Sequence, residues 1–342
     1  MRKKVRFGLV GCGAVSKLHI AAIQACPDAE IVAVCDPFRP NLVNAMQATG
    51  APGYPEYHEI LQRDDIDVID IMTATGLHAK MGIEAARAGK HVLVEKPIDT
   101  TIEAAQSLID ACRENGVKLS CIYQRRFGGP VAAIRAAQAR GDFGKLNECC
   151  CHTKWFRPQA YYDCVNWRGT WSMDGGGALM NQSIHYIDLM QYIMGDVDEV
   201  MGYTATLAHT GIETEDVGVA VLRFRTGALG LIEGTTSAYP GFSTRLDIHG
   251  ENGTVMLEDD VIKVWAFQNG AVCDDSLRTK TVQAHVYQIN DFTQAILCDR
   301  EPVVTGEDAL KALRIILAIY QSASLGRPVK VPRAAETETT CG

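Results

Sequence analysis

The sequence predicts a doubly wound α/β domain followed by an α+β domain with an open, mostly antiparallel sheet. A chain of 342 residues, 47% of them hydrophobic, is long enough for two cores, because single cores rarely grow past about 250–300 residues. Its first third alternates apolar runs with helical stretches, whereas the remainder is rich in extended stretches separated by glycine turns. We therefore expect domains at residues 1–122 and 123–332, followed by a loose tail at 333–342.

The first third contains continuous apolar runs that predict buried strands. The first run reads VRFGLV, the second reads IVAVCD, and three more read VIDIM, HVLVEK and KLSCIY. Helical stretches lie between them at residues 16–26, 41–49, 78–88 and 102–115. Strands that are buried on both faces are almost continuously apolar, and parallel strands need helical crossovers. The pattern therefore indicates a parallel sheet covered by helices on both faces.

A glycine-rich turn, GCGAVS, follows the first strand and opens the first helix. Glycines at these positions let the backbone approach a pyrophosphate, which the N-terminus of the helix can bind. An aspartate closes the second strand, near the ~20-residue spacing expected for an acid that holds the adenosine ribose. The acid also favours NAD over NADP, because a carboxylate repels a ribose phosphate. These residues predict a dinucleotide site in a Rossmann domain: Gly11, Gly13, Ala14, Val15 and Asp36.

Other strand ends carry polar residues that we expect to face the same cofactor, because parallel α/β sheets bind ligands at the carboxyl ends of their strands. For His78 the alternative is a helix-cap or surface histidine. Lys96 follows an apolar strand and a glutamate and precedes a proline, so it points to the cleft or forms a salt bridge with that glutamate. The expected cofactor contacts are Thr73, His78, Glu95, Lys96 and Gln124.

The second domain is predicted from extended stretches and from helices at residues 129–140, 285–297 and 307–325. Within it, the segment GGGALMNQSIHYIDL begins with three glycines and continues as a helical pattern. Asn181 and His185 are four residues apart, which places them on one face of a helix. This polar pair is either a satisfied feature of the core or the wall of a reaction site. We expect a site, because Lys96 and the cofactor motif are present as well.

The motifs GLVGCGAVSKLH, VLVEKP and GGGALMNQSIHYIDL together resemble those of the Gfo/Idh/MocA oxidoreductases over nearly the full chain. The resemblance implies an N-terminal Rossmann domain and an open-sheet domain used for homodimers or homotetramers. It also implies hydride transfer between a nicotinamide and a sugar or cyclitol carbinol. The surrounding sequence looks like the branch that includes dehydrogenases acting at carbon 3 of UDP-sugars and glycosides.

Carried over residue by residue, the resemblance makes Lys96 the lysine of the EKP motif and His185 the catalytic acid or base. Asp188 then supports the site from behind. Asn181 is a departure, since inositol-dehydrogenase-like members have an aspartate there, and an amide cannot accept a proton. We expect His185 to take the hydroxyl proton, Lys96 to donate a hydrogen bond to the alkoxide, and Asn181 to position another hydroxyl.

An aromatic and basic stretch at residues 154–171 is the predicted substrate wall, because sugars stack on aromatic rings and hydrogen-bond through their hydroxyls. The alternative for many of its aromatics is packing beneath a long loop. Arginines in the stretch could also meet a phosphate or carboxylate. With Asn181 and His185, the expected substrate residues are Trp155, Arg157, Tyr161, Trp167, Arg168 and Tyr287.

Two other functions remain open on these residues. Some relatives implied by the resemblance are glycosidases that retain NAD through the cycle, and others are regulators that sense the cofactor without turnover. The regulators tend to lack the lysine and histidine, which are both present here.

Composition narrows the partners and the compartment. A net charge of −8 and a pI near 5.6 argue against nucleic acid and anionic membranes. We find no signal peptide or membrane span, and therefore expect a cytoplasmic protein. The twelve cysteines include no CxxC pair, so we expect reduced structural thiols and no metal site.

Overall fold

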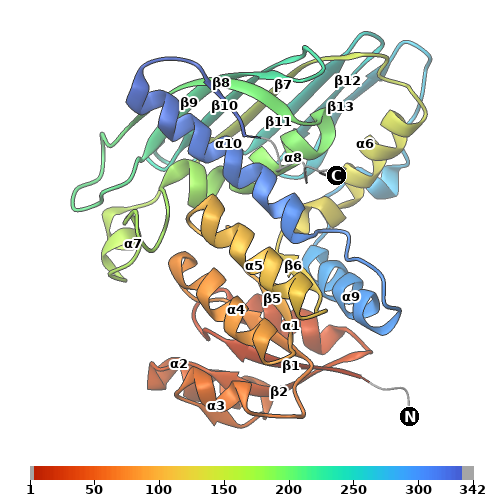
Figure 1. The fold of residues 1–342 in the computed structure, drawn as a ribbon. Helices are drawn as coiled ribbons and strands as arrows, with labels where there is room; N and C mark the ends of the chain where they lie inside the picture. Colours follow the sequence, from red (N-terminus) through yellow and green to blue (C-terminus); the bar gives the residue numbers. More distant parts are fainter. Residues whose placement is uncertain (1–3, 333–342) are drawn as a thin grey trace, which may run out of the picture.

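The computed structural model describes residues 4–332, and it shows two sheets with helices packed around and between them (Figure 1). The tail predicted at residues 333–342 lies outside the described residues. No helix within residues 4–332 has the length and apolar character needed to span a bilayer.

The first sheet has six parallel strands in the order β3-β2-β1-β4-β5-β6, which confirms the predicted doubly wound domain. The sequence prediction missed the two-residue strand β3 and the short helix α3, because neither is long enough to show a period. The strands are β1 Val5–Val10, β2 Ala29–Cys35, β3 Gly53–Tyr54, β4 Val68–Ile71, β5 His91–Val94 and β6 Leu119–Cys121. The helices are α1 Ser16–Ala25, α2 Arg39–Thr49, α3 Tyr57–Leu61, α4 His78–Arg87 and α5 Ile102–Glu114, with a 3₁₀ turn η1 at Thr75–Leu77.

The second sheet has eight strands in the order β13-β12-β11-β7-β10-β9-β8-β14. Among the described strands of this sheet, β7 and β10 run parallel and the remaining neighbours are antiparallel, as predicted. Its strands are β7 Leu146–Lys154, β8 Val197–Ala205, β9 Val217–Phe224, β10 Leu229–Thr235, β11 Arg245–Gly250, β12 Gly253–Glu258, β13 Val261–Phe267 and β14 Val329–Lys330.

Helices cover one face of this second sheet, and its other face is open. The covering helices α8 and α10 contact β7 and β8. Burial alternates along β9, where Ala220 and Leu222 are buried while Val219 and Val221 are exposed. The helices and turns of this part are η2 Gln124–Phe127, α6 Gly129–Ala139, α7 Gln159–Asp163, η3 Ala178–Ser183, α8 Ile184–Met194, η4 Asp275–Leu277, α9 Ala284–Leu297 and α10 Gly306–Leu325.

Helix α9 does not stay with the second sheet, although it falls within the predicted second domain. It lies against α1 of the first domain, as Figure 1 shows, and buries Ile289 and Phe292 in the same core as Phe7 and Ile23. Helix α10 packs on α5 as well as on the second sheet. The two sheets are therefore joined by continuous apolar packing.

A buried ion pair joins helix α8 to η2, the turn that directly follows the last strand of the first domain. Arg126, which follows β6, donates two hydrogen bonds of 2.8 and 2.6 Å to the carboxylate of Asp188 on α8. Both side chains are only 1% exposed. Although burial opposes it, Asp188 raises the pKa of Arg126, so the guanidinium stays charged. Asp188 thus fixes helix α8 relative to the first domain, a position behind the site like the one implied by the family resemblance.

Candidate active site

The site lies where the end of β5 meets the glycine-rich segment of the second domain. Lys96 follows β5, and its ammonium donates a 2.8 Å hydrogen bond to the backbone carbonyl of Asn181. Burial lowers the pKa of Lys96, while the carboxylates of Glu95 and Asp174 oppose that shift. A cation from one domain is thereby held by the backbone of the other.

The segment that carries Asn181 is not the regular α-helix that we expected. Residues Ala178–Ser183 form a π-helical turn, and the α-helix begins only at Ile184. π-Turns are rare and are frequently found at functional sites. The wider turn leaves the carbonyl of Asn181 available to Lys96, and His185 stands in the first turn of α8.

The three preceding glycines pass through space in which no side chain fits. A Cβ on Gly175 would lie 2.8 Å from Thr100, one on Gly176 would meet the hydroxyl of Tyr320, and one on Gly177 would meet the carbonyl of Glu215. Gly175 and Gly176 also have positive φ angles of 77° and 159°. The glycines are needed for close approach to neighbouring chain segments.

Glu215, from the loop between β8 and β9, holds the start of the π-turn. Its carboxylate accepts the N–H groups of Gly177 (2.9 Å) and Leu179 (2.8 Å) and the hydroxyl of Tyr320 (2.9 Å). Burial raises the pKa of Glu215 to about 7 despite these donors. The sequence held no sign of this role, because Glu215 lies in a run of polar residues about forty positions away.

His185 lies against Tyr123, with one ring nitrogen unpartnered in the described part of the chain. Its ring meets the ring of Tyr123 edge-on at 6.0 Å between centroids, and its Nδ1 has no hydrogen-bond partner within residues 4–332. Burial, together with the positive charges of Lys96 and Arg125, lowers its pKa well below the ordinary value of 6.5. A neutral imidazole at neutral pH can accept a proton.

Asn181 has an unexpected carboxylate neighbour. Its side-chain N–H donates a 2.6 Å hydrogen bond to Asp174, and its side-chain oxygen accepts one of 2.7 Å from Gln182. Asp174 is 2% exposed, and burial raises its pKa. The sequence analysis did not single out Asp174, because its contact with Asn181 depends on the fold of the glycine loop between them.

The predicted substrate wall forms an alternating stack of aromatic rings and guanidinium groups, Trp155–Arg157–Tyr161–Arg168–Trp167, which we call the arginine stack. Successive guanidinium-to-ring distances are 4.9, 5.2, 4.2 and 5.5 Å. Gln182 connects this stack to the reaction site, because its amide accepts from Arg157 (2.7 Å) and donates to the Tyr161 hydroxyl (3.0 Å). The five wall residues are thus brought together and joined to Asn181.

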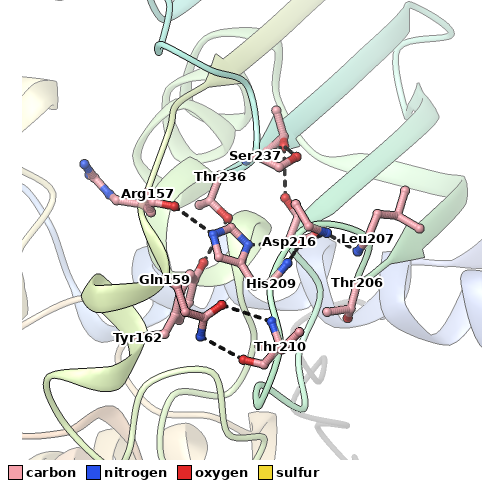
Figure 2. Close-up of polar contacts among 12 residues, drawn as sticks. Arg157, Gln159, Tyr162, Thr206, Leu207, His209, Thr210, Asp216, Thr236 and Ser237 are labelled. Carbon is pink, nitrogen blue, oxygen red and sulfur yellow. Dashed lines mark hydrogen bonds and ion pairs between the residues drawn. The ribbon is translucent and has the colours of Figure 1, made fainter.

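The loop after β8 binds the chain segment of Arg157 and Gln159, as Figure 2 shows. The ring of His209 lies between the carboxylate of Asp216 (3.0 Å) and the backbone carbonyl of Arg157 (2.7 Å). Gln159 and Thr210 exchange two further hydrogen bonds of 2.8 and 3.0 Å. Asp216 also accepts the N–H groups of residues 207–209, which lower its pKa although burial opposes this. The backbone that carries Arg157 is therefore fixed to the second sheet.

The nucleotide-binding end fits a dinucleotide. Gly11 has φ 88°, and a Cβ there would meet the backbone of Met72, whereas the space beside Gly13 is open. Within residues 4–332, the N–H groups of Gly13, Ala14 and Val15 donate no hydrogen bond. They stand at the N-terminus of α1, where a pyrophosphate is favoured. Asp36 lies beside this turn and accepts the N–H of Cys12 (2.8 Å).

The other strand-end residues have varied surroundings. The ring of His78 is buried between the carbonyls of Pro97 (2.8 Å) and Thr73 (3.1 Å), which is a structural setting. Gln124 opens η2 and lines a cavity of about 170 Å³ with Arg125 and His285. Tyr287 lies on α9, is 48% exposed, and has no hydrogen bond or ring contact with another site residue in the described chain.

The carboxylate of Glu95 does not form a salt bridge with the Lys96 ammonium, which was the alternative that the sequence left open. Instead it binds His19 of α1 (2.9 Å), whose other nitrogen contacts Asp70 of β4 (2.8 Å), and it accepts the backbone N–H of Lys96. Although burial lowers it, the two carboxylates raise the pKa of His19 to about 10. Burial would raise the pKa of Glu95, but His19 and Lys96 lower it to about 2. We call Asp70, His19 and Glu95 the buried triad.

A Rossmann domain with an open nucleotide turn, joined to a lysine–histidine site, defines an NAD-dependent oxidoreductase. Residues 5–123 match the oxidoreductase-family NAD-binding Rossmann fold, and residues 137–331 match the C-terminal alpha/beta domain of that family. The chain belongs to the Gfo/Idh/MocA oxidoreductase family, as the sequence motifs indicated.

Solved structures with the same fold carry informative ligands. The WlbA dehydrogenase of Bordetella pertussis, in complex with NADH and UDP-GlcNAcA, is 38% identical with a TM-score of 0.92, and the match covers 97% of this chain and 99% of that one. The WlbA dehydrogenase of Chromobacterium violaceum is 34% identical with a TM-score of 0.91, covering 97% of both chains. Among relatives compared by sequence, the inositol 2-dehydrogenase of Rhizobium meliloti is 28% identical, over 96% of this chain and 99% of the relative.

The buried triad generates a pH-dependent prediction. The pKa of His19 rises from 6.5 to about 10 on folding, so its stabilising effect is complete below pH 6.5 and is lost as the pH rises through about 10. We expect His19→Gln to reduce the free energy of unfolding by about 3–5 kcal/mol at pH 6, since it leaves two buried carboxylates facing a neutral group. The difference from the parent protein should shrink between pH 6.5 and 10.

Urea unfolding followed by circular dichroism at several pH values measures this difference. His58→Gln, at an exposed position on α3, is the matched control and should change little. A difference that stays constant from pH 6 to 10 would show that His19 is neutral in the folded protein.

Proposed function

We propose that this protein is an NAD-dependent dehydrogenase that oxidises a secondary hydroxyl of an acidic, nucleotide-linked sugar, with carbon 3 as the reacting position. The observation that carries the proposal is that Lys96, bound to the carbonyl of Asn181, lies near enough to His185 for its charge to lower the pKa of that buried ring. NAD supplies the hydride acceptor when bound. Residues 1–122 would hold it, and residues 123–332 would provide the substrate wall.

In the proposed reaction, His185 takes the proton of the substrate hydroxyl as hydride leaves the same carbon. The depressed pKa of His185 suits this role, because the ring is neutral before the reaction. Lys96 donates a hydrogen bond to the developing alkoxide. Asn181 serves the site through its neighbours, since its amide is already hydrogen-bonded to Asp174 and Gln182.

The arginine stack supports an acidic substrate. Arg157 and Arg168 carry two positive charges between three aromatic rings, which favours a carboxylate or phosphate beside a sugar ring. The WlbA dehydrogenase of Bordetella pertussis, which is 38% identical, was solved with UDP-GlcNAcA, an acidic nucleotide sugar. The presence of both Lys96 and His185 favours turnover over a role as a cofactor-sensing regulator.

We also propose that the chain acts as a homodimer or homotetramer in the cytoplasm. The open face of the second sheet carries exposed apolar side chains on three adjacent strands, namely Tyr203, Val219, Val221 and Leu229. Tyr203 is 68% exposed and Val221 is 55% exposed. An apolar patch of this kind on a soluble domain is typical of an interface.

The first prediction of this function is reduction of NAD⁺, followed by near-ultraviolet absorbance, with UDP-linked sugar acids but not with free inositols. We expect Lys96→Ala and His185→Ala each to lose about 10²-fold or more in kcat, because each removes a group used in the transition state. NAD binding, measured by fluorescence titration, should be unchanged in His185→Ala, because His185 is not an expected cofactor contact.

Lys80→Ala, at an exposed lysine of α4, is the control for the lysine variant. Normal turnover in both site variants would contradict the assignment. Release of NAD(H) on denaturation, without net reduction on any sugar, would instead favour a glycosidase that retains its cofactor.

The second prediction concerns the arginine stack. Arg157→Gln should raise KM for a carboxylate-bearing sugar by about 10–100-fold, because a charged hydrogen bond contributes roughly 1.5–3 kcal/mol. The neutral sugar amide should be affected much less. Steady-state kinetics with both substrates measures the contrast, and Arg87→Gln at an exposed position of α4 is the control. Equal losses on the two substrates would argue against charge recognition by Arg157.

The third prediction concerns assembly. Val221→Glu places a charge in the open face and should shift the protein toward monomer, as measured by light scattering after size-exclusion chromatography. Val303→Glu, at a position 47% exposed and outside that sheet, should leave the mass unchanged. A monomeric parent protein would refute the proposed assembly.

A further inference from the structure

A buried carboxylate, Asp174, binds the residue whose carbonyl holds Lys96. Asp174 stands immediately before the three glycines and is 2% exposed. One of its oxygens accepts the side-chain N–H of Asn181 (2.6 Å), and the other accepts the backbone N–H of Gly169 (2.9 Å). Both partners are donors, so the site matches an ionised carboxylate.

Asn181 connects Asp174 to two other side chains. Its backbone carbonyl accepts the hydrogen bond from the Lys96 ammonium, and its side-chain oxygen accepts one from Gln182. Gln182 in turn holds the guanidinium of Arg157. Asn181 therefore contacts the lysine through its backbone and the arginine stack through its side chain, and Asp174 holds that side chain in place.

The charges around Lys96 also point to Asp174. An asparagine at position 181 gives Lys96 no negative charge, yet a cation in a largely buried site needs one nearby. The groups whose charges act on Lys96 are Glu95, Asp174, Cys121 and Arg125. Of these, Glu95 is already committed to the cationic ring of His19, and Cys121 is a buried thiol.

We propose that Asp174 is a positioning residue, which orients Asn181 and provides Lys96 with the negative charge that position 181 lacks. The kinetic part of its test rests on the proposed dehydrogenase function. A second part needs no substrate, so failure of the function and failure of this inference give different results.

The pair can be reversed, which provides a sharp test. In the double variant Asp174→Asn/Asn181→Asp, the new amide at position 174 can accept from Gly169 and donate to the new carboxylate at position 181. That carboxylate can still accept from Gln182. The swap therefore retains each hydrogen bond and the total charge. Each single variant changes the total charge and loses the hydrogen bond between the side chains at positions 174 and 181.

With a sugar that the parent enzyme oxidises, we expect each single variant to lose about 10–100-fold in kcat/KM, because the lysine and the stack are displaced. The double variant should recover to within about threefold of the parent, a strongly non-additive result. The Kd for NAD should stay within about twofold throughout. Asp299→Asn, which removes an exposed carboxylate on the far side of the first domain, is the control.

The measurement that needs no substrate is the pH dependence of Lys96 labelling by acetic anhydride. The folded full-length protein is labelled, then digested and analysed by mass spectrometry. Burial lowers the pKa of Lys96 and the charge of Asp174 opposes that shift, so removal of this charge should move the labelling profile to lower pH. The swap should return the profile to that of the parent protein.

Additive losses in the double variant, or a labelling profile that Asp174→Asn leaves unchanged, would overturn the inference. If Asp174→Asn does not fold, the swap variant decides alone: a folded protein with the parent profile supports the inference, and an unfolded or shifted one overturns it. A labelling shift without turnover of any sugar would reject the proposed function and leave the positioning role standing.

Discussion

The absence of side chains at Gly175, Gly176 and Gly177 is the constraint on which the site depends. Thr100, Tyr320 and Glu215 occupy the space where three Cβ atoms would lie, so the chain passes only as bare backbone. This passage allows Glu215 to bind the N–H groups of Gly177 and Leu179 and to start a π-turn. The turn presents a carbonyl to Lys96, and α8 then places His185. A single methyl group at any of these glycines would displace the π-turn, the carbonyl that binds Lys96, and His185.

Several buried charged side chains of this molecule form ion pairs with partners that are distant in the sequence. Arg126 and Asp188, and His19 with Asp70 and Glu95, each join different elements across a core. Such groups add little net stability when complete, but removing one partner is costly, so they favour one arrangement over others. The reaction site thus sits on a rigid frame, which favours a preorganised environment for a developing alkoxide.

Much of the first domain could be predicted, because its strands are continuously apolar and its helices are long enough to show a period. The meeting of Lys96 with the Asn181 segment was also within reach, through the family resemblance. Other features were not. The π-turn depends on contacts from Glu215 and Tyr320, and nothing in the sequence of α1 marks His19 as the neighbour of Glu95. Asp174 reaches Asn181 only through a loop whose path sequence patterns do not describe.

Helix α9 has a consequence for how a cofactor is exchanged. Enzymes with two domains commonly open and close about a hinge in the linker. Here Gln288 of α9 bonds to the backbone of both Cys121 and Tyr123, at the point where the chain leaves the first domain. The same helix buries Ile289 and Phe292 against that domain. These contacts tie the linker to the first domain through a helix that comes late in the chain, which opposes a hinge motion that would separate the two sheets for nucleotide exchange.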